Sequence, residues 1–87
     1  MPFEVVQTQP TPNPNALKFV LSAPISATPQ SFFNAAAAQE NVVAKRLFEI
    51  NGVSSVLLLG DFVTVNKQPE VKWSAITPAV KKALAQV

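Results

Sequence analysis

The chain has few side chains that could do chemistry, and two of the most reactive types are missing from it. Its 87 residues include five Asp or Glu, seven Lys or Arg, and neither cysteine nor histidine. Without a thiol or an imidazole it cannot form a disulfide, a Ser-His-Asp triad or the usual ligand set of a zinc or iron–sulfur site. The acidic residues are scattered along the sequence: Glu4, Glu40, Glu49, Asp61 and Glu70. This composition argues against an enzyme and predicts no bound cofactor or metal.

One route to catalysis stays open, a serine–lysine pair with Lys67 or Lys72 as the base. A lysine acts as a base near neutral pH only when it is desolvated, and nothing in the sequence brings a serine beside either residue. Asp61 follows a glycine in a turn-like pair, where an aspartate commonly bonds local backbone groups. We therefore predict a protein that is not an enzyme, with the serine–lysine enzyme as an alternative.

The basic residues do not predict a nucleic-acid surface. The net charge is only +2, and the pairs Lys45-Arg46 and Lys81-Lys82 fall in two predicted helices far apart in the sequence. Neutralising even about six phosphates needs a concentrated basic face. We expect these four side chains to lie on ordinary solvated helix faces, and we expect no nucleic-acid partner.

Length and composition predict one folded domain covering residues 1–87. Apolar residues make up 48% of the chain and charged residues 14%, which favours a well-formed core over disorder. No stretch approaches the roughly 18–20 apolar residues of a membrane-spanning helix, and the first residues lack the pattern of a secretory or transit peptide. The prediction is a cytoplasmic protein with no membrane partner.

Two strands are predicted near the start, at residues 3–8 and 16–21, with a proline-rich connector between them. The connector carries three prolines, which remove backbone donors and exclude a helix. Its asparagines, Asn13 and Asn15, could form a recognition loop on a stiffened backbone. They could also close turns that shape the first hairpin, which is the interpretation we favour.

The clearest element is a hairpin of residues 53–59 and 62–67 joined by Gly60-Asp61. A two-residue loop would pair Leu59 with Phe62 and put one apolar set on the core face: Val56, Leu58, Val63 and Val65. The opposite face then carries Leu57, Leu59 and Phe62 near the turn. These three side chains either stay exposed as a contact site or are covered by residues 22–34 or 35–38.

The remaining elements complete the order β-β-(β)-α-β-β-α. Residues 22–34 read as an irregular crossing with a short strand at 31–33, and the conformation of the alanine run 35–38 stays open. One helix begins after Asn41 as N-cap and ends by Asn51-Gly52. A second apolar stripe follows: Trp73, Ile76, Val80, Leu84 and Val87. Within it, Pro78 either starts the main helical segment or lies inside a helix begun near Trp73.

This order predicts an α+β two-layer sandwich, a mainly antiparallel sheet with two helices on one face. Trp73 is expected to be a core anchor whose indole N–H reaches a carbonyl. Lys18 alternates with Leu17 and Phe19, so we expect a solvated strand residue, with docking of an acidic partner as the alternative.

Four stretches carry a family resemblance: TPNPNALKF (residues 11–19), VAKRLFEINGV (43–53), DFVTVNK (61–67) and WSAITP (73–78). In this order and spacing, the sequence resembles the N-terminal domain of the Nfu/NifU-type iron–sulfur scaffold proteins over nearly its whole length. In that family the domain is an α+β sandwich, and in full-length members it precedes a second domain whose CxxC carries or delivers a cluster. No CxxC is present here, so the resemblance implies the non-ligating domain.

The resemblance also implies a role in protein contact. The expected partners are iron–sulfur assembly proteins or CxxC-bearing scaffold proteins, bound without ligation of the cluster by this chain. The alternative is a small self-associating structural domain. The candidate contact residues are Leu57, Leu59, Phe62, Asn13, Asn15 and Lys18.

Overall fold

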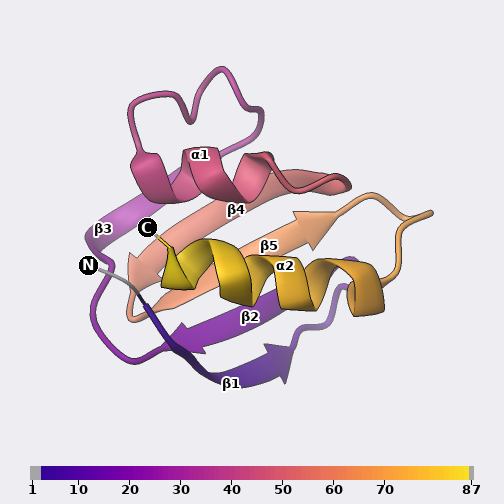
Figure 1. The fold of residues 1–87 in the computed structure, drawn as a ribbon, viewed down its shortest axis with the longest axis horizontal. Coiled ribbons are helices and arrows are strands. Elements are labelled where there is room, and N and C mark those ends of the chain that lie inside the picture. The colour runs from indigo at the N-terminus through magenta and orange to yellow at the C-terminus, as the bar shows by residue number, and fades with distance from the viewer. Residues whose placement is uncertain (1–2, 87) are drawn as a thin grey trace.

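Five strands and two helices make up the fold (Figure 1). The computed structural model describes residues 3–86, so Val87, expected at the end of the second apolar stripe, lies outside the described residues. The elements are β1 (Val5–Pro10), β2 (Ala16–Leu21), β3 (Ser26–Phe32), α1 (Val42–Phe48), β4 (Val53–Gly60), β5 (Phe62–Lys67) and α2 (Trp73–Ala85). The sheet order is β1-β2-β5-β4-β3, with every neighbouring pair antiparallel. The predicted α+β class and element order are confirmed.

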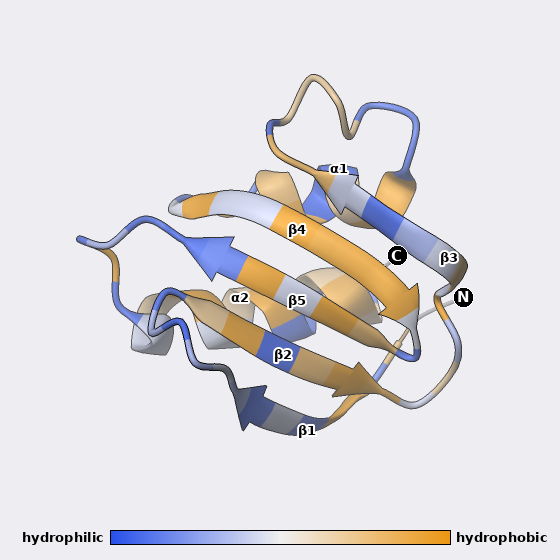
Figure 2. Cartoon of the chain, turned by 180° about the vertical axis from the view of Figure 1, so that it is seen from behind, coloured by the Kyte–Doolittle hydropathy of each residue, from blue (hydrophilic) through white to orange (hydrophobic). Residues whose placement is uncertain are grey.

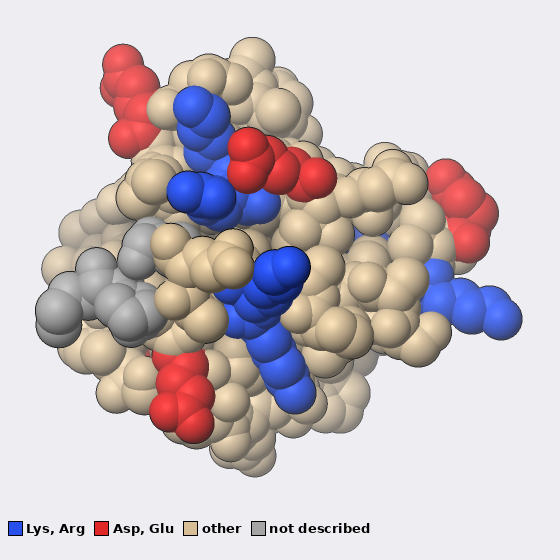
Figure 3. Space-filling view, in the orientation of Figure 1, with Lys and Arg blue, Asp and Glu red and all other residues tan. Residues whose placement is uncertain are grey.

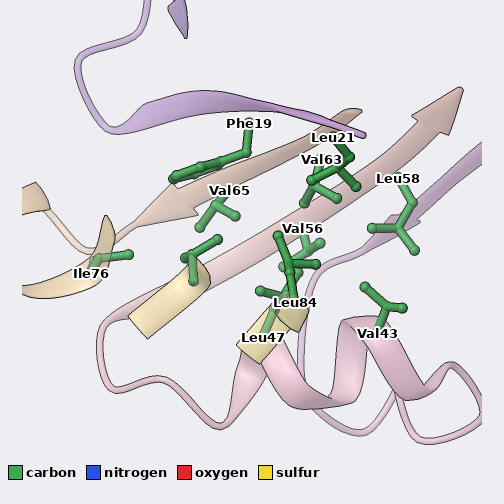
Figure 4. Close-up of a cluster of buried hydrophobic side chains, with 11 residues drawn as sticks. Phe19, Leu21, Val43, Leu47, Val56, Leu58, Val63, Val65, Ile76 and Leu84 are labelled. Carbon is green, nitrogen blue, oxygen red and sulfur yellow. The ribbon is translucent and has the colours of Figure 1, made fainter. Parts of the chain in front are cut away.

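Both helices lie on the same face of the sheet, and the core fills the space between the two layers (Figures 1 and 4). Each helix buries side chains at helical spacing, for example Val43 and Leu47 of α1 and Val80 and Leu84 of α2. The strands contribute Phe19, Leu21, Val56, Leu58, Val63 and Val65 to the same cluster. Seen from behind, the other face of the sheet is covered by no helix of residues 3–86 (Figure 2).

The predicted hairpin is confirmed in its register. Leu59 pairs with Phe62 and Leu58 with Val63 across β4 and β5. The turn uses Gly60 at φ 57°, whereas Asp61 keeps a negative φ, as in a type II′ turn with glycine first. Because successive side chains of a strand alternate, the core face and the opposite face of this hairpin are both fixed by that register.

The start of α1 also agrees with the sequence. The Asn41 side-chain oxygen accepts hydrogen bonds from the backbone N–H groups of Val43 and Ala44, both at 3.0 Å. After the helix, Gly52 takes φ 102°, and a Cβ built there would lie 2.9 Å from the Val71 methyl carbons. Glycine is therefore required at Gly52 both by its backbone conformation and by the close approach of Val71.

The third strand is longer and begins earlier than predicted. We expected a short strand at residues 31–33, but β3 runs over Ser26–Phe32 and pairs with β4. It is an edge strand, so Pro29 can be accommodated with a register shift between Ser26 and Gln30. Exposed, polar residues fill most of β3, which removes the apolar alternation that would have revealed the strand.

The structure answers two questions that the sequence left open, the conformation of residues 35–38 and the position of Pro78 in its helix. The alanine run 35–38 forms turns instead of a helix, with the Ala37 N–H donating to the Asn34 side-chain oxygen at 2.8 Å. Its last residue, Ala38, is fully buried. The second helix begins at Trp73 and carries Pro78 within it, which is the second of the two arrangements considered.

Candidate functional site

The most prominent candidate site is the sheet face opposite the helices, which we call the open face. Its apolar side chains come from the three central strands. Val20 of β2 pairs with Phe62 of β5, and Phe62 pairs with Leu59 of β4, so the three form one row across the sheet. Leu57 lies two residues from Leu59 on the same face. All four are only partly buried.

Two segments, residues 22–34 and 35–38, could have covered this row, and neither does. Residues 26–32 extend the sheet beside β4 instead of crossing its face, and residues 34–40 continue from the far end of β3 toward α1 (Figures 1 and 2). Within residues 3–86 both helices lie on the opposite side of the sheet. Leu57, Leu59 and Phe62 therefore lie on an uncovered face.

Lys18 belongs to the same face. It points away from the buried Phe19, as predicted, and pairs with Thr64 of β5. Its Nζ lies 4.1 Å from the centroid of the Phe62 ring, within the range of a cation–π contact. The lysine is half-buried as a result, so it forms part of the apolar surface and adds one positive charge to it.

The two asparagines of the connector do not face the row. The Asn13 side-chain oxygen accepts a hydrogen bond from the Asn15 N–H at 2.9 Å, which closes an Asx-turn. The Asn15 side-chain oxygen accepts from Lys67 Nζ at 3.0 Å, and the Lys67 N–H donates to the Asn15 carbonyl at 2.8 Å. These bonds support the favoured interpretation, in which the two asparagines form turns within the connector. Asn15 also holds the connector to Lys67 at the end of β5.

Trp73 also holds the connector in place, through a hydrogen bond to its backbone. Its Nε1–H donates to the Pro14 carbonyl at 3.1 Å, and its ring meets Phe19 edge-on with centroids 6.3 Å apart. The expected core anchor with a carbonyl partner is confirmed. The Lys67 ammonium lies 5.8 Å from the Trp73 ring centroid. Nothing in the sequence indicated the contact that joins Asn15 to Lys67 and Trp73, because Asn15 lies 52 residues before Lys67 in the chain.

Lys67 itself does not form the serine–lysine pair considered from the sequence. Its side chain is 9% exposed, and its hydrogen-bond acceptors are the Asn15 carboxamide and the Gln68 carbonyl. Lys72, the other lysine considered, is exposed at the start of α2. Among residues 3–86 no pocket opens, no group of three acidic residues could hold a metal, and no helix could cross a membrane.

Comparison with known proteins places this fold in a family. The family model described as "Scaffold protein Nfu/NifU N terminal" matches residues 6–87. The chain belongs to the Nfu/NifU N-terminal family. The match takes in the proline-rich connector, the hairpin and α2, so the resemblance seen in the sequence is confirmed.

Curated relatives of this Nfu/NifU N-terminal chain are longer than it is. The human mitochondrial NFU1 iron–sulfur cluster scaffold homolog is 43% identical over 77 residues, which cover 86% of this chain and 30% of the human protein. The Drosophila erecta protein of the same name is 40% identical over 77 residues and is covered to 27%. The chain thus spans less than a third of these relatives. Their names place those proteins in mitochondria, and a cytoplasmic location of this chain stays a prediction.

Solved structures share the fold. The solution structure of a NifU-like protein from Saccharomyces cerevisiae has a TM-score of 0.79 and 28% identity, covering 98% of this chain and 77% of the yeast one. Protein SeR13 from Staphylococcus epidermidis has a TM-score of 0.65 and 30% identity, covering 95% and 96%. Protein SAV1430 from Staphylococcus aureus, at a TM-score of 0.80 and 23% identity, covers 92% and 96% and shares the architecture.

Proposed function

We propose that this Nfu/NifU N-terminal chain is a non-catalytic protein-interaction domain that assists iron–sulfur cluster assembly or delivery without ligating the cluster. Family membership supports the pathway, because the curated relatives are named iron–sulfur cluster scaffold homologs. Iron–sulfur clusters are held chiefly by cysteine thiolates, with histidine in some sites, and this sequence has neither residue. The ligands must therefore come from outside these 87 residues.

The observation that carries the proposal is the apolar row of the open face. Val20, Phe62 and Leu59 lie side by side on three neighbouring strands, and Leu57 widens the row on β4. Uncharged polar residues flank it on β1 and on the side of β4 and β5 away from the turn: Gln7, Gln9, Ser55, Thr64 and Asn66. An apolar centre with a polar rim is the usual anatomy of a protein–protein interface.

The partner that fits this face is a protein with an apolar patch of its own and a carboxylate placed opposite Lys18. The lysine is the charged residue of the three central strands on this side, and its Nζ already rests against Phe62. We expect that partner to be a CxxC-bearing scaffold protein, which would bring the cysteine ligands that this chain lacks.

An NMR titration tests the proposal. The ¹⁵N-labelled chain is titrated under anaerobic conditions with a purified CxxC-bearing scaffold domain, both without and with its cluster. Shift changes are expected on β2, β4 and β5. Leu57→Ser and Leu59→Ser should each weaken binding about tenfold or more, since central apolar contacts carry most of the energy of an interface.

The matched control is Phe33→Ser. Phe33 is 75% exposed, the highest value among the large apolar residues that the structure describes, and it follows the end of β3 that lies away from the Gly60-Asp61 turn. Its loss should leave binding unchanged. Binding that is equally weakened by Phe33→Ser, or that is insensitive to both leucine variants, would refute the open face as the contact site. A failure of every CxxC protein tried to bind would refute the partner.

Self-association is the competing function, because a second copy could cover the same row. Sedimentation at several concentrations separates the two. A monomer up to high micromolar concentration agrees with an adaptor, whereas a dimer that Leu57→Ser dissociates would establish the structural alternative.

A further inference from the structure

The fold brings together two basic pairs that are remote in the sequence. Lys45 and Arg46 lie on α1, and Lys81 and Lys82 lie on α2. We call these four side chains the basic helix layer. Both helices pack on one face of the sheet and bury their apolar sides in the same core, so their exposed sides face the same solvent (Figure 1). The sequence alone had assigned the pairs to separate solvated faces.

The charges on these helices are of one sign. Every charged residue within α1 and α2 is basic, and all four are exposed. In Figure 3 most of the Lys and Arg side chains in view gather over the middle of the helix side, with one acidic side chain beside them, whereas the other acidic groups lie toward the rim. Glu49, the C-cap residue of α1, is the acidic residue that lies nearest in sequence to Lys45 and Arg46.

Helix dipoles explain only part of this arrangement. Lys45, Arg46 and Lys82 lie in the last turns of their helices, where a cation interacts favourably with the partial negative charge of the C-terminus. That effect acts within each helix separately. It does not require two cationic helices to lie next to each other, where their like charges repel and lower the stability of the fold. An acidic partner would offset this repulsion.

We propose that the basic helix layer docks an acidic protein surface. The proposal goes beyond the function assigned to the open face, because the two surfaces lie on opposite sides of the sheet. The chain could then hold two partners at once, one against the apolar row and an acidic one against the helices. Such a domain would bridge two proteins while contributing no ligand of its own.

A protein suits the basic helix layer better than a nucleic acid does. Four cations match only about four phosphates, which gives weak and strongly salt-dependent binding. No aromatic side chain within α1 or α2 is exposed, so there is no platform on which bases could stack. Val42, however, is 58% exposed one helical turn before Lys45 and Arg46. A protein partner could cover this apolar side chain, whereas a phosphate backbone could not.

The test uses a synthetic 20-residue glutamate-rich helical peptide, titrated into the ¹⁵N-labelled chain at low salt. Shift changes are expected on α1 and α2 and not on the open face. Lys82→Glu should weaken binding about fivefold to tenfold, from the loss and reversal of surface ion pairs. Lys72→Glu is the matched control, because it changes the charge equally at the other end of the same helix and should have little effect. If Lys82→Glu impairs folding, Lys82→Gln provides the same comparison with Lys72→Gln.

Equal weakening by the Lys72 and Lys82 variants would overturn the proposal, because it would show a response to net charge alone. So would shift changes spread over the whole surface. A single-stranded oligonucleotide and phosphatidylserine vesicles are run in parallel, and tighter binding of either through α1 and α2 would also overturn it. The titration contains no CxxC protein, so its failure would leave the proposed function of the open face standing.

Discussion

The contact between Asn15 and Lys67 gives the sharpest prediction about what holds the connector in place. Lys67 is nearly buried, and the shorter of its two side-chain hydrogen bonds runs from Nζ to the Asn15 side-chain oxygen at 3.0 Å. Asn15→Ala removes that acceptor but keeps the backbone hydrogen bond between the two residues. No described residue other than glycine has a positive φ, so alanine can adopt the backbone conformation of Asn15.

The expected cost follows from the burial of the charge. A hydrogen bond to a charged group contributes about 1.5–3 kcal/mol. In Asn15→Ala the nearly buried Lys67 ammonium would keep only its longer hydrogen bond to the Gln68 carbonyl, at 3.4 Å. We expect Asn15→Ala to lower the free energy of unfolding by about 2 kcal/mol, which corresponds to about 8–16 °C in Tm for a domain of this size. Lys67→Met keeps an aliphatic side chain and removes the charge. It should therefore lower the free energy of unfolding by less than Asn15→Ala does.

A double-mutant cycle, measured by urea denaturation, isolates the bond. In the Lys67→Met background, Asn15→Ala should cost less than about 0.5 kcal/mol, because no ammonium remains to be satisfied. Asn15→Asp is the control, since it keeps an acceptor at the same place and should retain stability. If Asn15→Ala costs the same with and without the lysine, the side-chain bond does not account for the role of Asn15.

Three further predictions concern the fold, each measured by urea or thermal denaturation. Leu58→Ala should destabilise the domain by about 2–5 kcal/mol, since Leu58 is 1% exposed in the core; a loss under about 1 kcal/mol would contradict the packing. Asn41→Ala should cost about 1 kcal/mol through the lost N-cap, whereas Asn41→Ser should restore most of it. Gly52→Ala should cost more than Gly60→Ala: both glycines have positive φ, but a Cβ at Gly52 would meet Val71 at 2.9 Å and one at Gly60 would meet nothing within 4 Å. The reverse order would contradict the geometry.

Elements with strong local signals were predictable. The hairpin register follows from Gly60-Asp61 between two apolar runs, because a two-residue loop fixes which residues pair. The start of α1 follows from Asn41, whose side chain satisfies N–H groups only two and three residues away. In both places the interaction lies within a few residues, so the local sequence contains it.

The third strand and the candidate surfaces were harder to predict. β3 has little apolar pattern, because its stability comes from hydrogen bonds to β4, a partner more than twenty residues away. The contact group of the open face, Leu57, Leu59 and Phe62, was named from the hairpin alone. Its neighbours Val20 and Lys18 join it only through the pairing of β2 with β5, more than forty residues apart in the chain.

The amino-acid order by itself determined the α+β class, the hairpin, the helix cap and the family, and it left the chain without a thiol or an imidazole. Tertiary packing decided that the face bearing Phe62 stays uncovered, that Asn15 meets Lys67, and that four cations gather over two helices. The reason is physical. Turns and caps are governed by interactions between near neighbours, whereas a surface is assembled by whichever distant segments the core brings side by side.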